Sequence, residues 1–248
     1  MLSRRMVASG HVLFRWRSFV LFAFLPVFVW AVWDGKIIEQ SFGSAASLLV
    51  DTLGFALIAV GELIRIGTVG FVPRNTSGRN TDKGQLAERL NTTGLYSLMR
   101  NPLYLGNCMM YVGLAVLTQH LWFAVVLALF LVIYYERIIC AEEDFLQGKF
   151  GAPYLEWAQK VPPFFPRLHG WEKPDMDFSL RTVIRREHAS ILGGFVGVYL
   201  VLLGLHSLPA NAQPMPEVWH WIIGTVVAVD VIVVALKKLT NVFAVEGR

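Results

Sequence analysis

The sequence predicts an all-α polytopic integral membrane protein with about six transmembrane helices. Of its 248 residues, 55% are hydrophobic and only 16% are charged, whereas soluble domains carry roughly 25% charged residues. Several segments with few or no charges approach the roughly 20 residues that a helix needs to cross a bilayer. Lys and Arg residues gather in a few connections between these segments. These observations exclude a soluble globular domain, a collagen-like chain and a coiled coil.

Six segments are the predicted spans. They are Ser18–Trp33, Ala45–Ile64, Leu103–Leu117, Leu121–Tyr135, Ala189–Leu208 and Val218–Leu236. Only Thr118, Gln119 and His120 separate the third segment from the fourth, so we expect a tight helical hairpin whose arms are short for full crossings. The turn-forming stretch 209–216 divides the last two. No small-residue cleavage pattern follows Trp33, so the first span is predicted to be a retained anchor.

Basic residues predict the orientation, because Lys and Arg are retained on the cytoplasmic side of a membrane. Of the 22 Lys and Arg residues, only Lys36 falls outside; the other 21 lie at the N-terminus, in the 65–100 connection, in the 137–188 connection or at the C-terminal end. Both termini and both long connections are therefore predicted to be cytoplasmic. Most of the polar chemistry lies in these connections, so we expect a site that faces the cytoplasm from an inner or cytoplasmic-type membrane.

The connection after the second span ends in a helix-start signal. Asn101 and Pro102 are suited to the N-cap and the first turn. A helix that begins there places Arg100 just outside the membrane face and Tyr104 and Gly106 in its first turns. Free amides at such a helix start favour an anionic group, and Gly106 permits the close approach of a backbone or a ligand. A simple anchoring role for Arg100 and Tyr104 at the interface is the alternative interpretation.

A second polar block follows the hairpin. If the helix of the fourth span continues outward, Glu136 and Glu143 share one face, and Glu142 lies about 100° around it. The short turn brings the start of one arm beside the end of the other, so Arg100 and the Glu142–Glu143 pair should meet. We therefore expect a pocket with a basic end, an acidic end and aromatic walls. The alternative is a solvated acidic patch balanced by Lys149.

Together the two blocks resemble the membrane-embedded methyltransferase family that includes isoprenylcysteine carboxyl methyltransferases and phospholipid N-methyltransferases. The family pattern is Arg-His-Pro-x-Tyr-x-Gly, then Glu-Glu-x-x-Leu after a helical hairpin, then Phe-Gly-x-x-Tyr and Val-Pro-x-x-x-Pro. The matching segments here are Arg100-Asn101-Pro102-Leu103-Tyr104-Leu105-Gly106, Glu142-Glu143-Asp144-Phe145-Leu146, Phe150-Gly151-Ala152-Pro153-Tyr154, and Val161-Pro162 with Pro166. Gly61 and Arg65 also resemble the family's Gly-x-x-x-Arg position, and the resemblance covers about residues 53–168. Asn101 replaces the family histidine; its amide can donate and accept but cannot become cationic.

The resemblance implies three regions: an N-terminal anchor (1–43), a methyltransferase core with an S-adenosylmethionine site (44–168), and a basic linker with two additional spans (169–248). It implies that Arg100 and Glu143 are catalytic, with Glu143 as base if the acceptor is a lipid ammonium. The implied cofactor-binding residues are Tyr96, Arg100, Asn101, Pro102, Tyr104, Gly106, Glu142, Glu143, Phe150 and Tyr154. Arg65, Arg79 and Asn80 are candidates to bind the acceptor, a lipid head-group amine, phosphate or carboxylate, or a prenylcysteine carboxylate.

Two other functions stay open. Membrane sterol reductases resemble the same positions and use a nicotinamide cofactor, but the Glu142–Glu143 pair would repel its pyrophosphate. A small transporter is suggested by Asp51, Glu62 and Asp230 in or near spans, although Glu62 and Arg65 have the spacing of a helical pair.

Neither metal nor nucleic acid is an expected partner. Cys108 and Cys140 match no zinc spacing. The basic segment before the fifth span is typical of contact with anionic lipid head groups. That segment contains Arg181, Arg185, Arg186 and His188.

Overall fold

The computed structural model of the chain describes residues 2–16, 19–73, 76, 80–81, 84–85, 87–210 and 212–248. Regular structure in these ranges is almost entirely helical. The exception is an antiparallel pair of two-residue strands, β1 (Asn80–Thr81) and β2 (Gly84–Gln85). The all-α prediction is therefore confirmed for the described residues.

The N-terminal region contains more helices than the single predicted span. Helix α1 (Leu2–Arg15) packs on α6 (Leu121–Phe150), where Gly10 lies directly against the backbone of Arg137. The predicted first span is then divided into a 3-10 helix, η1 (Val20–Phe24), and α2 (Leu25–Trp33), which has a proline in its first turn. A short helix, α3 (Ile37–Phe42), follows. The proline of α2 lies in the first turn, where its missing donor is tolerated, and the stretch Val20–Phe42 is long and apolar enough to cross a membrane.

Helices α4 (Ser44–Val69) and α5 (Pro102–Leu117) pack closely against each other. Gly54 and Gly61 on α4 face Gly113 and Gly106 on α5; a Cβ added to Gly61 would lie 2.6 Å from the Gly106 carbonyl oxygen. Seven-residue spacing keeps each glycine pair on one helix face. The close approach predicted at Gly106 is thus an approach of the α4 backbone.

The tight hairpin between α5 and α6 is confirmed, since α5 ends at Leu117 and α6 begins at Leu121. The turn residue Gln119 is fully buried and has a φ of 62°. Its side-chain amide donates to Ser47 Oγ (2.6 Å) and to Asp51 Oδ1 (3.1 Å), both on α4. These bonds explain why a non-glycine residue holds a left-handed conformation there. As expected, α6 continues outward, and it ends at Phe150.

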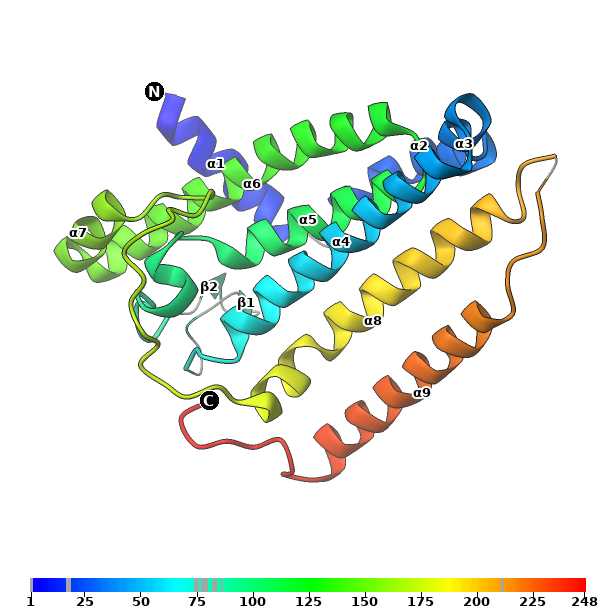
Figure 1. The fold of residues 1–248 in the computed structure, drawn as a ribbon. Helices are drawn as coiled ribbons and strands as arrows, with labels where there is room; N and C mark the ends of the chain where they lie inside the picture. The colour runs from blue at the N-terminus through cyan, green and yellow to red at the C-terminus, as the bar shows by residue number, and fades with distance from the viewer. Residues whose placement is uncertain are drawn as a thin grey trace.

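The C-terminal part contains α7 (Ala152–Lys160), α8 (Leu180–Leu205) and α9 (Val218–Leu239). Helix α8 begins at Leu180 rather than at Ala189, because Ser179 caps it by accepting from the Thr182 amide (3.2 Å). The second half of the predicted 168–188 linker is therefore helical. Helix α9 lies beside α8, as Figure 1 shows, and the His188 and Asp230 side chains join them at 2.8 Å.

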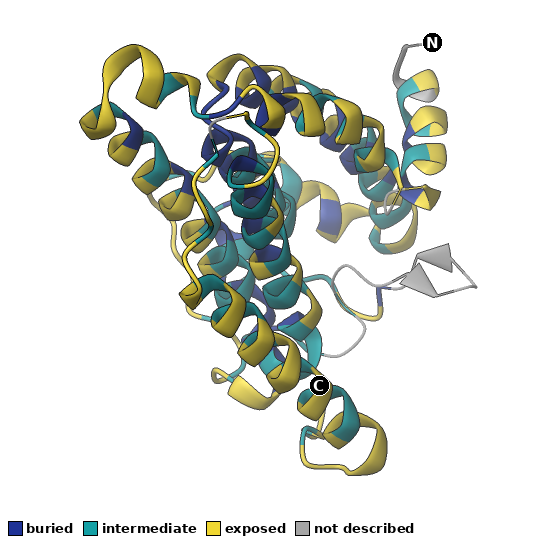
Figure 2. Cartoon of the chain, turned by 90° about the vertical axis from the view of Figure 1, so that its right-hand side faces the viewer, coloured by how far each residue is buried: buried dark blue, intermediate teal, exposed yellow. Residues whose placement is uncertain are grey.

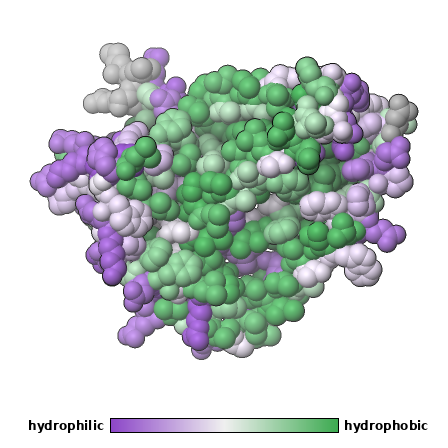
Figure 3. All heavy atoms as spheres, viewed as in Figure 1, coloured by the Kyte–Doolittle hydropathy of each residue, from purple (hydrophilic) through white to green (hydrophobic). Residues whose placement is uncertain are grey.

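Long helices α4, α5, α8 and α9 run side by side, and both chain termini lie toward the end of the bundle that carries α7 (Figure 1). Buried residues line the inner sides of α4, α5 and α8, whereas α9 has none (Figure 2). Apolar side chains cover the middle of the face shown in Figure 3, and hydrophilic ones gather at two opposite ends. This distribution is that of an integral membrane protein.

Four helical stretches of the described chain are long and apolar enough to cross a membrane: Val20–Phe42, Ser44–Val69, Leu121–Phe150 and Leu180–Leu205. The 16 residues of α5 form a shorter apolar helix. The predicted count of about six spans is thus matched in part, with α5 as a short hairpin arm and α9 as a further helix against α8.

We expect Gly61→Ala to destabilise the protein, because the added methyl group would meet the Gly106 carbonyl oxygen at 2.6 Å. Overpacking of this kind costs about 1–3 kcal/mol. The matched control is Gly224→Ala, where an added Cβ meets nothing within 4 Å and alanine favours the helix. Thermal unfolding in detergent should show a lower midpoint for the first variant alone; equal midpoints would contradict the close contact.

Candidate active site

The segment before α5 is held in place by the region that follows α6. A 3-10 helix, η2 (Gly94–Ser97), precedes the Arg100 motif. Trp157 on α7 donates from Nε1 to the Tyr96 carbonyl (3.2 Å), and Arg167 donates from Nε to the Ser97 carbonyl (3.0 Å). The Arg167 amide also donates to the Leu98 carbonyl (3.0 Å). Two stretches about 70 residues apart in sequence therefore form one platform.

The Val-Pro stretch binds directly to the Arg-Asn-Pro motif. The Arg100 amide donates to the Pro162 carbonyl (2.9 Å), and Asn101 Nδ2 donates to the Pro163 carbonyl (2.8 Å). Helix α5 begins at Pro102 as predicted, but the Asn101 side chain makes no cap hydrogen bond. The predicted capping role was wrong: the bond donated by Nδ2 holds the side chain at the Pro163 carbonyl, and its oxygen, which would be the capping acceptor, bonds no amide of the first turn.

Arg100 and Glu143 meet at the open end of the hairpin, as the short turn predicts. Arg100 Nη1 lies 3.2 Å from Glu143 Oε1, and their side chains are 15% and 28% exposed. Next to them, the Tyr104 hydroxyl donates to Glu142 Oε1 (2.8 Å). The Tyr104 ring packs on Tyr135 of α6 with 4.8 Å between ring centroids. A cation, two carboxylates and an aromatic wall thus converge at this point.

Polar groups at this cluster are under-satisfied. Among the described residues, five buried side-chain polar atoms have no hydrogen-bond partner, and three of them belong to Arg100 (Nε), Glu143 (Oε1) and Tyr154 (Oη). Glu143 Oε1 has the Arg100 charge beside it but no hydrogen bond. An unsatisfied buried polar group costs about 1–3 kcal/mol. Three in one cluster leave donors and an acceptor that a bound polar group would satisfy.

Tyr154 on α7 completes the cluster, with only 2% of its surface exposed. Burial, followed by the neighbouring Glu143 charge, raises the pKa of its hydroxyl well above the usual range for tyrosine. The phenol therefore stays neutral at physiological pH and keeps its proton as a hydrogen-bond donor. Its ring packs edge-on against Trp157, at 5.8 Å between centroids.

The remaining predicted cofactor residues lie on the same elements with different surroundings. Tyr96 is half-buried in η2, and Pro102 is buried in the first turn of α5. Phe150 ends α6, where Lys149 Nζ lies 5.9 Å from its ring. Gly106 faces α4, since an added Cβ would lie 2.7 Å from the Gly61 carbonyl oxygen. Its surroundings are those of a helix contact.

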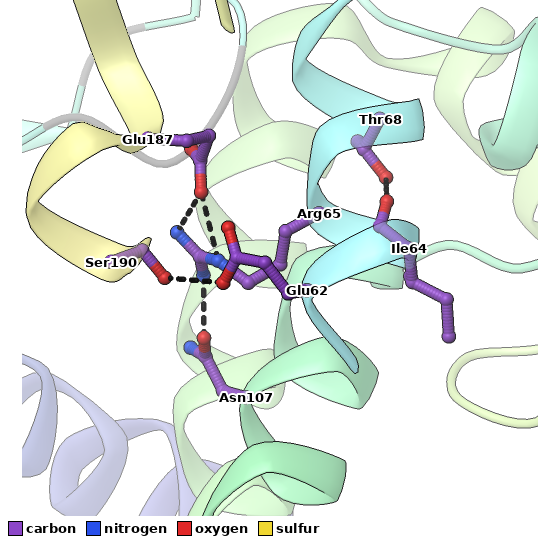
Figure 4. Close-up of polar contacts among 7 residues, drawn as sticks. All are labelled: Glu62, Ile64, Arg65, Thr68, Asn107, Glu187 and Ser190. Atoms are coloured by element: carbon purple, nitrogen blue, oxygen red, sulfur yellow. Dashed lines mark hydrogen bonds and ion pairs between the residues drawn. The ribbon is translucent and has the colours of Figure 1, made fainter. Parts of the chain in front are cut away.

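Of the predicted acceptor-binding residues, only Arg65 has a described side chain. Its guanidinium donates twice to Glu187 Oε2 (2.9 and 2.6 Å) and once to Asn107 Oδ1 (2.5 Å) (Figure 4). Arg65 thus joins α4, α5 and α8. Arg79 lies outside the described residues, and only the backbone of Asn80 is described.

Sequence reasoning missed several partners of these residues. Glu187 was assigned to a linker, so its pairing with Arg65 was not predicted. Arg167 and Trp157 were missed because they act through backbone carbonyls, which leave no residue-type signature. The one available signal was the proximity of Arg167 to the Val-Pro stretch.

The acids predicted as marks of an ion path have partners within the protein. Asp51 accepts from Gln119, Asp230 contacts His188, and Glu62 Oε2 accepts from Ser190 Oγ (3.1 Å). Glu62 and Arg65 were offered as a helical pair, but Arg65 pairs with Glu187 instead. These contacts weigh against a transport path.

This fold and site define a class of protein. It is a helical membrane protein in which an arginine and a glutamate pair at the open end of a helical hairpin. Residues 50–153 match the family model of phospholipid methyltransferases. This region of the chain is therefore a phospholipid methyltransferase domain by its match to the family model, and the chain is a distant homologue of isoprenylcysteine O-methyltransferases.

Curated relatives carry two kinds of name. Cobalt-zinc-cadmium resistance protein CzcN of Cupriavidus metallidurans is 33% identical over 64% of this chain and 66% of its own length. Nickel-cobalt-cadmium resistance protein NccN of Alcaligenes xylosoxydans xylosoxydans is 34% identical over 52% of this chain and 54% of its own. Protein-S-isoprenylcysteine O-methyltransferase B of Arabidopsis thaliana is 28% identical over 47% of this chain and 59% of its own.

The chain therefore spans between about half and two thirds of the length of these relatives. No solved structure matches it significantly. Within the described residues, no group of three or more His, Cys, Asp or Glu side chains is arranged to hold a metal ion. Two of these relatives are named for resistance to metals, but the described residues of this chain contain no such cluster of metal ligands.

We expect Asn101→Leu to destabilise the protein, because it removes the donor to the Pro163 carbonyl. A hydrogen bond of this kind contributes about 1 kcal/mol. Asn101→His, which places the family residue at this position, retains a ring N–H donor and should unfold closer to the wild-type temperature. Thermal unfolding of the two variants tests this order, and the reverse order would contradict it.

Proposed function

We propose that this protein is an S-adenosylmethionine-dependent methyltransferase that modifies a membrane-borne lipidic acceptor. The observation that carries the proposal is the buried, under-satisfied cluster of Arg100, Glu143 and Tyr154. Arg100 and Glu143 lie in the region that matches the family model of phospholipid methyltransferases, and Tyr154 directly follows that region. A cation, an anion and a neutral donor in one place suit a zwitterionic ligand.

The side chains of the cluster fit the two ends of the amino-acid part of S-adenosylmethionine. Arg100, with a free Nε donor, would bind the carboxylate through charge-assisted hydrogen bonds. Glu143 Oε1 and the Glu142 carboxylate would accept from the ammonium. When bound, the cofactor would supply an electrophilic methyl group beside the aromatic rings of Tyr104 and Tyr154.

The protein's part in the reaction would be mainly to position the reactants and exclude water. The hydrogen bonds from the Arg100 backbone amide to the Pro162 carbonyl and from the Asn101 side chain to the Pro163 carbonyl hold the cluster rigid. If the acceptor is a carboxylate or a phosphate, it attacks without a base. If it is a lipid ammonium, Glu143 is the proposed base that removes its proton.

We place the site on the cytoplasmic side, because the 65–100 and 137–188 connections carry most of the basic residues. Arg65, Arg79 and Asn80 remain our candidates to meet an anionic head group, with Arg65 held by Glu187 and Asn107 in this structure. The carboxylates of the cluster disfavour a nicotinamide-dependent reductase, since they would repel a pyrophosphate. The proposal gives no role to a metal ion.

We expect Arg100→Ala and Glu143→Gln to lose S-adenosylmethionine binding. Charged hydrogen bonds contribute about 1.5–3 kcal/mol, so each change should weaken binding by about tenfold or more. Calorimetry on detergent-purified protein measures this directly. If the wild-type protein binds S-adenosylmethionine, the next experiment is a search for radiolabelled methyl transfer to lipid extracts.

Matched controls separate binding from charge and folding. Arg181→Ala and Glu156→Gln remove the same side-chain types from exposed positions on α8 and α7 and should bind like wild type. If wild-type protein in lipid does not bind S-adenosylmethionine, the proposed function is wrong. If both cluster variants bind as well as the controls, the site is elsewhere.

Tyr154→Phe should separate affinity from stability. Its hydroxyl lies beside the Arg100 side chain but makes no well-aligned hydrogen bond, so its removal should change the unfolding temperature little. If the hydroxyl donates to the cofactor, the same change should weaken binding several-fold. Loss of stability with unchanged affinity would show that the hydroxyl serves the fold and not the ligand.

A further inference from the structure

A cavity of about 560 Å³ lies among α4, α5, α8 and α9, separate from the Arg100 cluster. Its walls include Phe55 and Ile58 of α4, Met110 of α5, Phe195 of α8 and Ile222 of α9. The volume lies within the roughly 300–1,000 Å³ of small-molecule sites. Both α8 and α9 follow the family-matched region 50–153, so this cavity depends on the chain's own C-terminal helices.

The cavity lies within the apolar part of the helices and is almost entirely hydrophobic. Trp219 of α9 stacks on Phe55, with ring planes 7° apart and centroids 6.1 Å apart. Gly194 of α8 keeps space open, because an added Cβ would meet only the Met110 methyl carbon, at 3.4 Å. A hydrocarbon chain from the bilayer is the ligand that such walls accommodate.

One ionisable side chain, Glu62, lines the cavity. Its Oε2 accepts from Ser190 (3.1 Å), while its Oε1 is buried without a hydrogen-bond partner. The nearby Arg65 cation is already bonded to Glu187 and Asn107, as Figure 4 shows. Arg65 thus pairs with Glu187 and not with Glu62, which leaves an unsatisfied carboxyl acceptor at the polar end of the cavity.

We propose that this cavity binds the hydrocarbon chain of an amphiphile whose polar end, an ammonium or a hydroxyl group, donates a hydrogen bond to Glu62. A donor supplies what Glu62 Oε1 lacks, whereas an anionic end would face the Glu62 carboxylate. The apolar walls would contact the hydrocarbon chain along its length and hold it in one conformation. This inference concerns a second site and does not rest on the methyltransferase function.

Photolabelling of the full chain in phosphatidylcholine nanodiscs tests the proposal. The probes are octadecylamine and octadecanol that carry a diazirine in the chain, and labelled residues are mapped by mass spectrometry. We expect saturable labelling at cavity residues such as Met110 and Ile222. An excess of unlabelled octadecylamine should compete, and octadecanoic acid should compete at least tenfold less well.

Two glycine variants provide a matched pair. Gly194→Leu fills the cavity and should reduce specific labelling by about tenfold or more. Gly193→Leu adds the same side chain at the next position of α8, where a Cβ meets nothing within 4 Å, and should label like wild type. Unfolding temperatures of both variants show whether α8 is still packed.

Variants of Glu62 distinguish the two polar ends. Glu62→Gln keeps an acceptor oxygen but loses the charge, so it should weaken the amine probe by about tenfold and the alcohol probe much less. Glu62→Leu should weaken both. Equal labelling of Gly194→Leu and Gly193→Leu would overturn the proposal, as would label confined to exposed helix faces or competition by octadecanoic acid equal to that by the amine.

Discussion

The close contact between the α4 and α5 backbones is the constraint on which the rest of the structure depends. Gly61 and Gly106 lie so near that no side chain fits between them. This proximity lets Arg65, one turn beyond Gly61, reach Asn107 on α5 and still bond Glu187 on α8. One glycine contact therefore fixes how the hairpin, the second span and the C-terminal helices meet.

The candidate active site combines a rigid backbone with unsatisfied side chains. Carbonyl groups of Tyr96, Ser97 and Leu98 accept bonds from α7 and from Arg167, so the segment before α5 cannot shift easily. Against this fixed frame, Arg100, Glu143 and Tyr154 keep buried polar atoms without hydrogen bonds. These polar atoms can therefore form hydrogen bonds with a ligand, and they form none that stabilise the fold.

Much of this fold follows from sequence alone, because apolar length and proline positions are local signals. The hairpin at 118–120 and the start of α5 at Pro102 were predicted correctly, and so was the meeting of Arg100 with Glu143. Capping by Asn101 was wrong because its side chain is directed by a long-range contact: its Nδ2 donates to the carbonyl of Pro163, some 60 residues away, and its oxygen caps no amide. The early start of α8 was missed because its first turns are basic and polar, which conceals a helix whose cap at Ser179 is a single hydrogen bond.

The length of α6 determines how far the candidate active site lies from the hairpin turn. Glu143 lies 22 residues after Leu121, which corresponds to about 33 Å along the helix axis at 1.5 Å per residue. The hydrocarbon core of a bilayer is about 30 Å thick. The part of α6 between the hairpin turn and Glu143, the catalytic carboxylate of the proposed reaction, is therefore about as long as the hydrocarbon core is thick. Bilayer thickness then becomes a variable of that reaction, because a thicker or thinner membrane moves the lipid head groups relative to a carboxylate that the helix holds at constant height.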